Sequence, residues 1–268
     1  MKKILVIFIL VLLFISIPGC EKDEENVIVV GASSTPHAEI LEQVKPILEA
    51  QGYKLEIIRI DDYKIPNTSL YQGSLDANYF QHLPFLNLYN KDNNTNLVSV
   101  GAVHYEPFGL YGNNITNIDE TNKLVLIPND GSNRSRALLL LQQVGIITLK
   151  DNIDPAGDIT LKDVVNFNGF EIKELAAENL ASSLKFNEKG TLAVINGNYA
   201  LSAGLDIATA LAIEDASGQA ATTYANIVAV RSENQNDPKI QALINALKSE
   251  EIKNYIYSTF NGAVRPAN

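Results

Sequence analysis

The sequence lacks a second cysteine. With Cys20 as its only thiol, the chain cannot form an internal disulfide, so the folded part must be stable on its hydrophobic core alone. Basic residues are also scarce, since 21 lysines and arginines stand against 31 aspartates and glutamates, for a net charge of −10. Nucleic acids and anionic lipid headgroups are recognised through basic patches. We therefore expect no nucleic acid partner and no charge-driven binding to anionic lipid.

The motifs of common enzyme classes are absent as well. The sequence contains no G-x-S-x-G nucleophile elbow, no phosphate-binding P-loop, no G-x-G-x-x-G and no H-E-x-x-H. An extracytoplasmic hydrolase is the least favoured alternative, because its triad would have to be assembled from scattered residues. We expect a protein that is not an enzyme and that needs no cofactor.

Histidine is nearly absent, with His37, His82 and His104 as the only three in the chain. Three histidines can hold zinc, and Glu39 and Glu106 lie close to two of them in sequence. No pair has the spacing of a metal motif, so hydrogen-bonded or ligand-stacking histidines are favoured. We assign no metal, and a zinc-type receptor that uses the three histidines stays as the alternative function.

The N-terminus has the pattern of an export signal. Residues 1–19 hold two lysines, no acid and an apolar run that is too short to span a bilayer comfortably. The stretch Ile17-Pro18-Gly19-Cys20 is similar to a bacterial lipobox, so we expect cleavage before Cys20 and lipid attachment to its thiol. Two acyl chains would anchor the protein outside the cytoplasm on a bacterial membrane, with residues 20–26 as a charged tether. An exported protein with an incidental thiol is disfavoured, because exposed free cysteines are generally avoided.

The rest of the chain alternates strands with helices. Apolar runs predict strands at 27–31, 55–60 and 75–80, separated by an amphipathic helix over 36–51 and a short helix over 66–71. This alternation implies an α/β fold with a parallel sheet. A second unit repeats the pattern: a strand is expected at 123–127, a helix capped by Ser132 or Asn133, further strands at 171–175, 191–196 and 225–230, and helices at 161–165, 199–204, 206–214, 239–249 and 252–260.

The chain can cross between these two units at two places, an extended stretch over 97–111 and a loop over 216–224. Two crossings predict a discontinuous first lobe of residues 27–108 and 224–268, and a second lobe of residues 109–223. Open α/β sheets bind ligands at the carboxyl ends of their strands. We therefore expect a ligand cleft between the two lobes.

Aromatic and polar side chains gather at the expected strand ends. Residues 79–82 end the third strand with two aromatic rings and an imidazole. Arg136 lies in the first turn of a helix, where a guanidinium and the helix N-terminus both favour a carboxylate. Asn196, Asn198 and Asn226 follow strands and could hold an ammonium or carboxylate group. Each feature alone is weak, but the combination is typical of a site that recognises an amino acid.

Eight segments occur in a characteristic order, at residues 36–41, 75–82, 97–101, 104–107, 127–130, 136–142, 193–201 and 224–226. Together they resemble the NlpA/MetQ family of methionine-binding lipoproteins, from about residue 27 to residue 264. The resemblance implies two open-sheet lobes in a type II periplasmic-binding-protein fold. It also implies a receptor that delivers methionine, a methionine derivative or a methionyl dipeptide to the permease and ATPase subunits of an importer.

The resemblance also implies which residues form the ligand pocket. The apolar side of methionine would contact Tyr63, Phe80, His82 and His104, the carboxylate would contact Arg136, and Asn196 and Asn226 would complete the polar end. Sulfur contacts with aromatic rings are favourable by roughly 0.3 to 1.5 kcal/mol. The sequence departs from the family pattern at residues 108–109, 130–135 and 190–192, which bears on ligand choice more than on fold.

Overall fold

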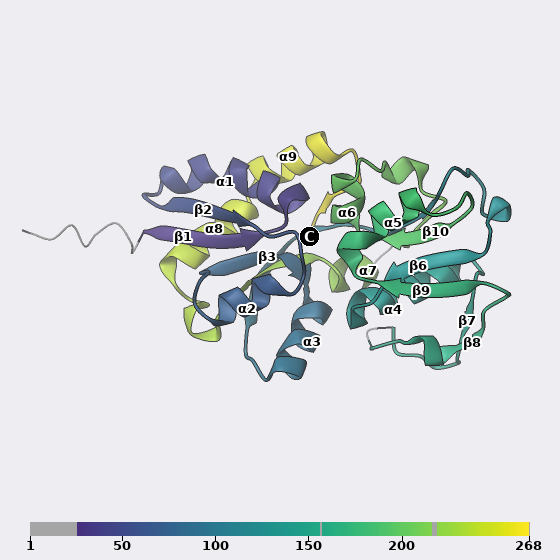
Figure 1. Ribbon diagram of the computed structural model, residues 1–268. Coiled ribbons are helices and arrows are strands. Elements are labelled where there is room, and N and C mark those ends of the chain that lie inside the picture. The colour runs from purple at the N-terminus through teal and green to yellow at the C-terminus, as the bar shows by residue number, and fades with distance from the viewer. Residues whose placement is uncertain (1–25, 156, 216–218, 268) are drawn as a thin grey trace, which may run out of the picture.

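The structure is a computed structural model that describes residues 26–155, 157–215 and 219–267 (Figure 1). The expected signal peptide, Cys20 as the expected site of lipidation and all but the last residue of the expected tether lie outside the described residues. Within the described ranges, no helix has the length and apolar character needed to cross a membrane.

The first half of the molecule is built on a six-stranded mixed sheet. Its strand order is β13-β4-β12-β3-β1-β2, with β1 parallel to β2 and β3, as expected from the strand–helix alternation. The expected strand at 225–230 adds to this parallel unit and runs antiparallel to both of its neighbours, so the whole sheet is mixed. This strand returns from the other half of the molecule and so enters the sheet at the opposite end. The strands are β1 Val27–Ala32, β2 Lys54–Arg59, β3 Ala77–His82, β4 Val98–Tyr105, β12 Asn226–Val230 and β13 Arg265–Pro266.

The second half is built on a five-stranded sheet of order β11-β5-β10-β6-β9. Strands β9, β6 and β10 are parallel, and β5 and β11 add an antiparallel edge. A two-stranded ribbon, β7 with β8, lies beside this sheet. The strands are β5 Gly109–Gly112, β6 Leu124–Pro128, β7 Thr148–Leu149, β8 Val164–Asn166, β9 Glu171–Leu175, β10 Leu192–Ile195 and β11 Ala212–Ile213.

Helices cover both sheets (Figure 1). The longer ones are α1 Glu39–Glu49, α2 Ile65–Tyr71, α3 Leu83–Asn93, α4 Gly131–Gln143, α5 Leu180–Phe186, α6 Gly197–Ser202, α7 Gln219–Thr223, α8 Pro238–Leu247 and α9 Glu250–Phe260. Single helical turns are η1 Ser34–Ala38, η2 Ile118–Glu120, η3 Leu161–Asp163, η4 Ala177–Asn179, η5 Ile207–Thr209 and η6 Ser232–Asn234. The helices expected over 161–165 and 206–214 are only the turns η3 and η5, each followed by an edge strand.

Each sheet has its own hydrophobic core. In the first half, α1, α8 and α9 pack together over one face of the sheet, and α1 buries Ile40, Leu41, Val44 and Leu48 at helical spacing. Full burial of such a side chain contributes about 1.5 to 3 kcal/mol relative to exposure. In the second half, α4 buries Leu138 and Leu141 against the other sheet. Two cores without a shared centre leave room for a site at the boundary.

The chain passes between the sheets twice. The expected extended stretch over 97–111 is two strands, because β4 ends at Tyr105 in the first sheet and β5 begins at Gly109 in the second. Pro107 lies between them and has no N–H with which to continue a ladder. The second crossing runs from β11 to β12. Both crossings lead past the ends of β3 and β10, where the polar strand-end residues gather.

Candidate functional site

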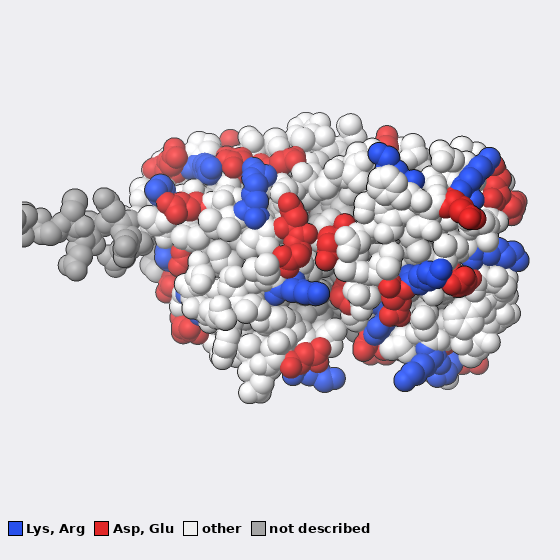
Figure 2. All heavy atoms as spheres, in the orientation of Figure 1, with Lys and Arg blue, Asp and Glu red and all other residues white. Residues whose placement is uncertain are grey.

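A buried cavity lies at the boundary between the two sheets. It encloses an empty volume of about 340 Å³, part of which is open to solvent, and both halves contribute to its walls. On the face seen in Figure 2, acidic side chains gather on both sides of the boundary. A mixed apolar and polar lining inside a cleft is typical of small-molecule sites.

One wall of the cavity is aromatic. Tyr63 follows β2, Phe80 lies on β3 and Phe85 lies in the first turn of α3. The centroid of the Tyr63 ring lies 5.8 Å from those of both phenylalanines, which are 5.7 Å from each other. These separations fall in the range in which tilted and edge-to-face aromatic pairs are favourable. The wall is a preformed apolar surface that would fit a flexible, unbranched side chain.

Arg136 lies at the polar end, with 4 % of its side chain exposed. Its Nε and Nη2 donate to the two carboxylate oxygens of Glu214 at 3.0 and 2.6 Å, and Nη2 also donates to the Glu106 carbonyl oxygen at 3.1 Å. The guanidinium carbon lies 3.9 Å from the Phe108 ring centroid and 4.5 Å from that of Tyr224. The Tyr105 hydroxyl also interacts with the guanidinium. Arg136 is therefore held rigidly on the cavity wall.

Glu214 is the buried partner of Arg136, and it was not predicted. Its carboxylate also accepts a hydrogen bond from the Tyr105 hydroxyl at 2.7 Å. Burial by itself would raise the pKa of Glu214, but the attraction of Arg136 outweighs it and the pKa lies below its ordinary value. No spacing in the sequence could reveal this pair, because the two residues are 78 positions apart. The sequence also placed Glu214 at the end of the helix expected over 206–214, which gave no reason to expect it in a ligand site.

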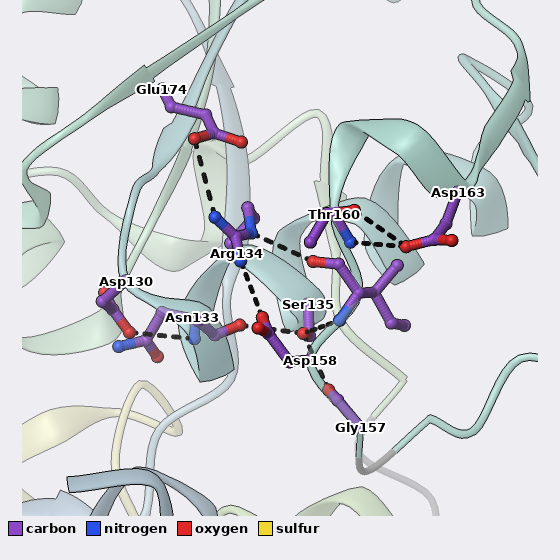
Figure 3. A network of polar contacts seen from close by, with 11 residues as sticks. Asp130, Asn133, Arg134, Ser135, Gly157, Asp158, Thr160, Asp163 and Glu174 are labelled. Carbon is purple, nitrogen blue, oxygen red and sulfur yellow. Dashed lines mark hydrogen bonds and ion pairs between the residues drawn. The ribbon is translucent and has the colours of Figure 1, made fainter. Parts of the chain in front are cut away.

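The N-terminus of α4 is anchored by a polar network (Figure 3). The N-cap is Asp130, whose Oδ1 accepts from the Asn133 N–H at 3.1 Å, so the prediction of Ser132 or Asn133 as the cap was wrong. Arg134 donates to Asp158 at 2.7 Å and to the Ile159 carbonyl at 3.0 Å. Aspartate, serine and asparagine all accept well from the N-terminal amides of a helix, so the sequence pattern alone could not show which of them is the N-cap. The network fixes the start of the helix that carries Arg136.

Amide side chains form much of the remaining polar surface. Asn226 Oδ1 contacts His37 Nε2 at 3.0 Å, and Asn133 Oδ1 contacts His82 Nε2 at 3.2 Å. Asn196 Oδ1 is buried on the cavity and has no hydrogen-bond partner among the described residues. An orphaned buried oxygen is costly unless a ligand or water supplies a donor. Asn196 therefore marks a position where a ligand N–H group would be favourable.

Glu106 lies on the cavity wall, backed by two buried histidines. Its Oε1 is 2.6 Å from His104 Nε2 and 3.6 Å from His37 Nε2, and His104 Nδ1 also contacts the Tyr79 hydroxyl. Burial raises the pKa of Glu106 to about 7 and lowers the pKa of His37 to about 4 and that of His104 to about 3. Both histidines are therefore neutral near neutral pH.

Six of the seven predicted ligand residues line the cavity. They are Tyr63, Phe80, His82, Arg136, Asn196 and Asn226. The seventh, His104, is fully buried behind the wall and is not among the lining residues. The lining residues missing from the prediction are Gln81, Phe85, Glu106, Phe108, Asn133, Gly197 and Asn198. The sequence had pointed to two of these seven, to Asn198 as an amide after a strand and to Glu106 as a neighbour of His104.

The three histidines do not form one metal-binding group. Among the described residues, the group whose ligand atoms lie within 4.8 Å of one another is His37, His104 and Glu106, and it does not include His82. The Nε2 atoms of His37 and His104 already face hydrogen-bond partners, Asn226 and Glu106. His82 instead contacts Asn133 and the Tyr224 ring. The alternative of a zinc receptor built on all three histidines is not favoured by this arrangement.

Two hydrogen bonds between the halves close the cavity mouth. The Tyr63 hydroxyl donates to Asn198 Oδ1 at 2.6 Å, and the Tyr199 hydroxyl donates to the Asp61 carbonyl at 2.8 Å. Tyr63 and Asp61 follow β2 of the first sheet, whereas Asn198 and Tyr199 lie on α6 beside the second sheet. In the first contact the donor belongs to the first half, and in the second contact the donor belongs to the second half. These contacts link the two halves directly beside the cavity.

Comparison with known proteins gives concordant matches. The family model for NlpA lipoprotein matches residues 28–268. The methionine-binding lipoprotein MetQ of Bacillus subtilis is 37 % identical over 253 residues, which cover 92 % of this chain and 90 % of that protein. The D-methionine-binding lipoprotein MetQ of Escherichia coli K12 is 34 % identical over 255 residues, which cover 92 % of each chain. A Burkholderia cenocepacia nutrient-binding protein, solved bound to methionine, aligns with a TM-score of 0.83 at 34 % identity, covering 90 % of this chain and all of that one.

Proposed function

Because the chain belongs to the NlpA lipoprotein family, we propose that it captures methionine, or a close relative of it, for an ATP-driven importer. Its fold is a periplasmic-binding-protein fold, as expected from the resemblance. The observation that carries the proposal is the cavity itself, which joins an aromatic wall to an arginine, a carboxylate and an orphaned amide oxygen. These groups complement the side chain, carboxylate and ammonium of an apolar amino acid.

The ligand's polar end would lie between Arg136 and Glu106. The carboxylate would accept from Arg136 Nη1, while Glu214, bound through Nε and Nη2, fixes the plane of the guanidinium. The ammonium would donate to Glu106, to Asn196 Oδ1 and to the amide of Asn226. Each contact uses a group that is buried and already oriented, so little ordering is needed on binding.

The ligand's side chain would lie along the aromatic wall of Tyr63, Phe80 and Phe85, with His82 at its edge. A thioether is polarizable and unbranched, and it packs well against ring edges. Phe80 and His82 are only 4 % and 5 % exposed, so this part of the cavity is almost dry. The wall therefore favours methionine over short or charged side chains.

Capture would be accompanied by closure of two lobes about the crossings near residues 106–108 and 214–225. The lobes would have the boundaries expected from the sequence, residues 27–108 with 224–268 and residues 109–223. Closure would form the Tyr63–Asn198 and Tyr199–Asp61 hydrogen bonds across the mouth. Opening would break them and expose the ligand to the importer.

The remaining partners follow from the leader and the family. Lipid on Cys20 would hold the protein on the extracytoplasmic face of a membrane, beside the permease and ATPase subunits that receive the ligand. Anchoring confines the receptor to the surface where its permease lies and raises its local concentration there. The protein would bind its ligand without catalysing a reaction, in line with relatives that are named as binding proteins.

Calorimetry tests the function. The purified protein, stripped of ligand by unfolding and refolding, is titrated with L-methionine, D-methionine, methionyl dipeptides, other apolar amino acids and zinc. We expect saturable binding of a methionine compound and none of zinc. A response to zinc alone would favour the metal receptor, and turnover of an ester or amide panel would favour a hydrolase.

The mouth contacts give a prediction for Tyr63→Phe. This variant keeps the ring in the aromatic wall and removes only the hydroxyl that bridges to Asn198. A typical hydrogen bond contributes about 0.5 to 1.5 kcal/mol, so methionine affinity should fall by roughly 2- to 12-fold, mainly through faster release. Stopped-flow release of methionine measures this directly.

Tyr89→Phe is the matched control, because its hydroxyl contacts Thr68 on the same half, away from the mouth. Its release rate should equal that of the unaltered protein. Equal rates for the Tyr63 variant as well would show that the bridge does not hold the cavity closed.

A further inference from the structure

The Glu106 carboxylate is held in place on the cavity wall by close packing on both sides. It follows β4 at the first crossing and is 5 % exposed. A Cβ atom on Gly197 would lie 2.6 Å from Glu106 Cβ and 2.7 Å from Oε2, so only glycine lets the start of α6 approach this closely. Glu106 is therefore clamped between the second-half helix and the histidines of the first half.

The hydrogen bonds behind Glu106 can be satisfied with or without a proton on its carboxyl group. When Glu106 is ionised, His104 Nε2–H donates to Oε1, and His104 Nδ1 accepts from the Tyr79 hydroxyl. When Glu106 is protonated, its O–H donates to Nε2, and Nδ1–H donates to the hydroxyl oxygen of Tyr79. The same heavy-atom positions serve both states. Tyr79 itself stays protonated, because burial raises its pKa.

The groups that face Glu106 offset only part of the cost of ionising its carboxylate. His37 on η1 faces Asn226 Oδ1 with its Nε2, and its buried Nδ1 has no partner, so a second proton there would be unsatisfied. Arg136 on α4 and the backbone N–H of Asn198 at the start of α6 both favour the ionised carboxylate, but burial outweighs them, and the guanidinium is already held in a two-point contact with Glu214. A buried carboxylate is costly when ionised unless a cation pairs with it closely. A ligand can bring such a cation.

We infer that Glu106 is the ammonium site, and that in the free protein it holds a proton that an incoming ammonium group displaces, with His104 and His37 as positioning residues. The inference rests on the proposed function and deepens it, because it names the ligand class: a compound with a free α-ammonium. On binding, the carboxyl O–H bond breaks and the proton leaves to solvent, while the ammonium forms an ion pair with the carboxylate. No covalent bond to the ligand is made.

The sign of the pH dependence follows from the pKa of Glu106, which burial raises to about 7. Below that pH the free protein is protonated, and each ligand bound must release a proton. The affinity should therefore fall as pH decreases below 7, approaching tenfold per pH unit. Above pH 7 the carboxylate is already ionised, and the affinity should be flat until the ligand's own amine deprotonates.

The test is calorimetric proton counting on the purified, ligand-stripped protein. Methionine is titrated at pH 6 and at pH 8, each in two buffers with different ionisation enthalpies. We expect about one proton released per methionine at pH 6 and close to none at pH 8. N-acetylmethionine, which has no ammonium, should bind at least 100-fold more weakly at pH 8.

Two variants test whether the proton released on methionine binding comes from Glu106. Glu106→Gln keeps the shape of the protonated side chain, so it should fold normally, release no proton and bind with an affinity that no longer changes between pH 6 and pH 8. The matched control is Glu39→Gln on α1, whose carboxylate contacts Thr35 and does not line the cavity. It should keep the proton release of the unaltered protein.

Two outcomes separate this inference from the proposed function. Methionine binding without proton release at pH 6, or proton release that persists in Glu106→Gln, would overturn the inference and leave methionine capture intact. No methionine binding at either pH would overturn both. The measurements on the unaltered protein decide the first point without depending on any variant.

Discussion

Replacing Arg136 with alanine should weaken methionine binding by about 30- to 5,000-fold. Loss of one partner of a buried, hydrogen-bonded charge pair typically costs about 2 to 5 kcal/mol of binding free energy. Arg136 is 4 % exposed, and it is the arginine among the residues that line the cavity. Nothing else described there could replace it as a cation for the ligand carboxylate. Calorimetry on the refolded variant measures the change.

Arg134→Ala is the matched control for this experiment. Arg134 lies on the same helix two residues earlier, but it contacts Asp158 and Ile159 and does not line the cavity. Its removal should leave methionine affinity within about threefold, since its partners lie away from the cavity and its ion pair with Asp158 is partly exposed. Equal losses in the two variants would point to damage at the start of α4, and unchanged affinity in Arg136→Ala would show that another group holds the carboxylate.

Glu214→Ala should destabilise the ligand-free protein by about 3 to 5 kcal/mol, because it leaves the Arg136 guanidinium buried with its main partner removed. Urea unfolding monitored by circular dichroism measures this loss. Saturating methionine should restore part of the stability, since the ligand carboxylate then provides a partner for the same guanidinium. The recovery should exceed the stabilisation that methionine gives the unaltered protein under the same conditions.

A double variant separates charge from packing in this prediction. Arg136→Met combined with Glu214→Leu replaces the buried pair by apolar side chains of similar volume, which is often neutral for stability. It should unfold close to the unaltered protein and yet not bind methionine. If Glu214→Ala alone unfolds at the same urea concentration as the unaltered protein, the pair is not the buried, dry interaction described above.

The local pattern of the sequence predicted those elements whose neighbours in the chain are also neighbours in space. The β1-α1-β2 unit has strong apolar periodicity and a positive-φ glycine, Gly52, just after the helix, so both its type and its end could be predicted. The direction of β12 could not be predicted from the local pattern, because it depends on where the chain returns from the second sheet. The helix predicted over 206–214 was wrong for a similar reason. The pairing of β11 with β5 in the second sheet outweighs the weak helical pattern of these residues.

The residues of the candidate site likewise fall into those that the sequence could predict and those that it could not. Strand β3 carries Phe80 and His82 at its end, so their place at this edge of the sheet follows from topology. Arg136 was expected in the first turn of its helix, but α4 begins at Gly131 and puts it in the second turn. Residues 104 and 106 share a face near the end of β4, so the sequence could place them together but could not show which one reaches the cavity. The structure puts Glu106 on the wall and His104 behind it. Glu214 was beyond prediction, because only the tertiary fold brings it to Arg136.

The most direct test of the account is a crystal structure of the refolded protein with selenomethionine as the ligand. The chain contains a single methionine, Met1, so an anomalous selenium peak inside the cleft would come from the ligand. We predict one strong peak against the aromatic wall of Tyr63, Phe80 and Phe85, with the ligand carboxylate at Arg136 and its ammonium at Glu106. A selenium peak outside this cavity, or a ligand bound in it with its carboxylate turned away from Arg136, would contradict the account.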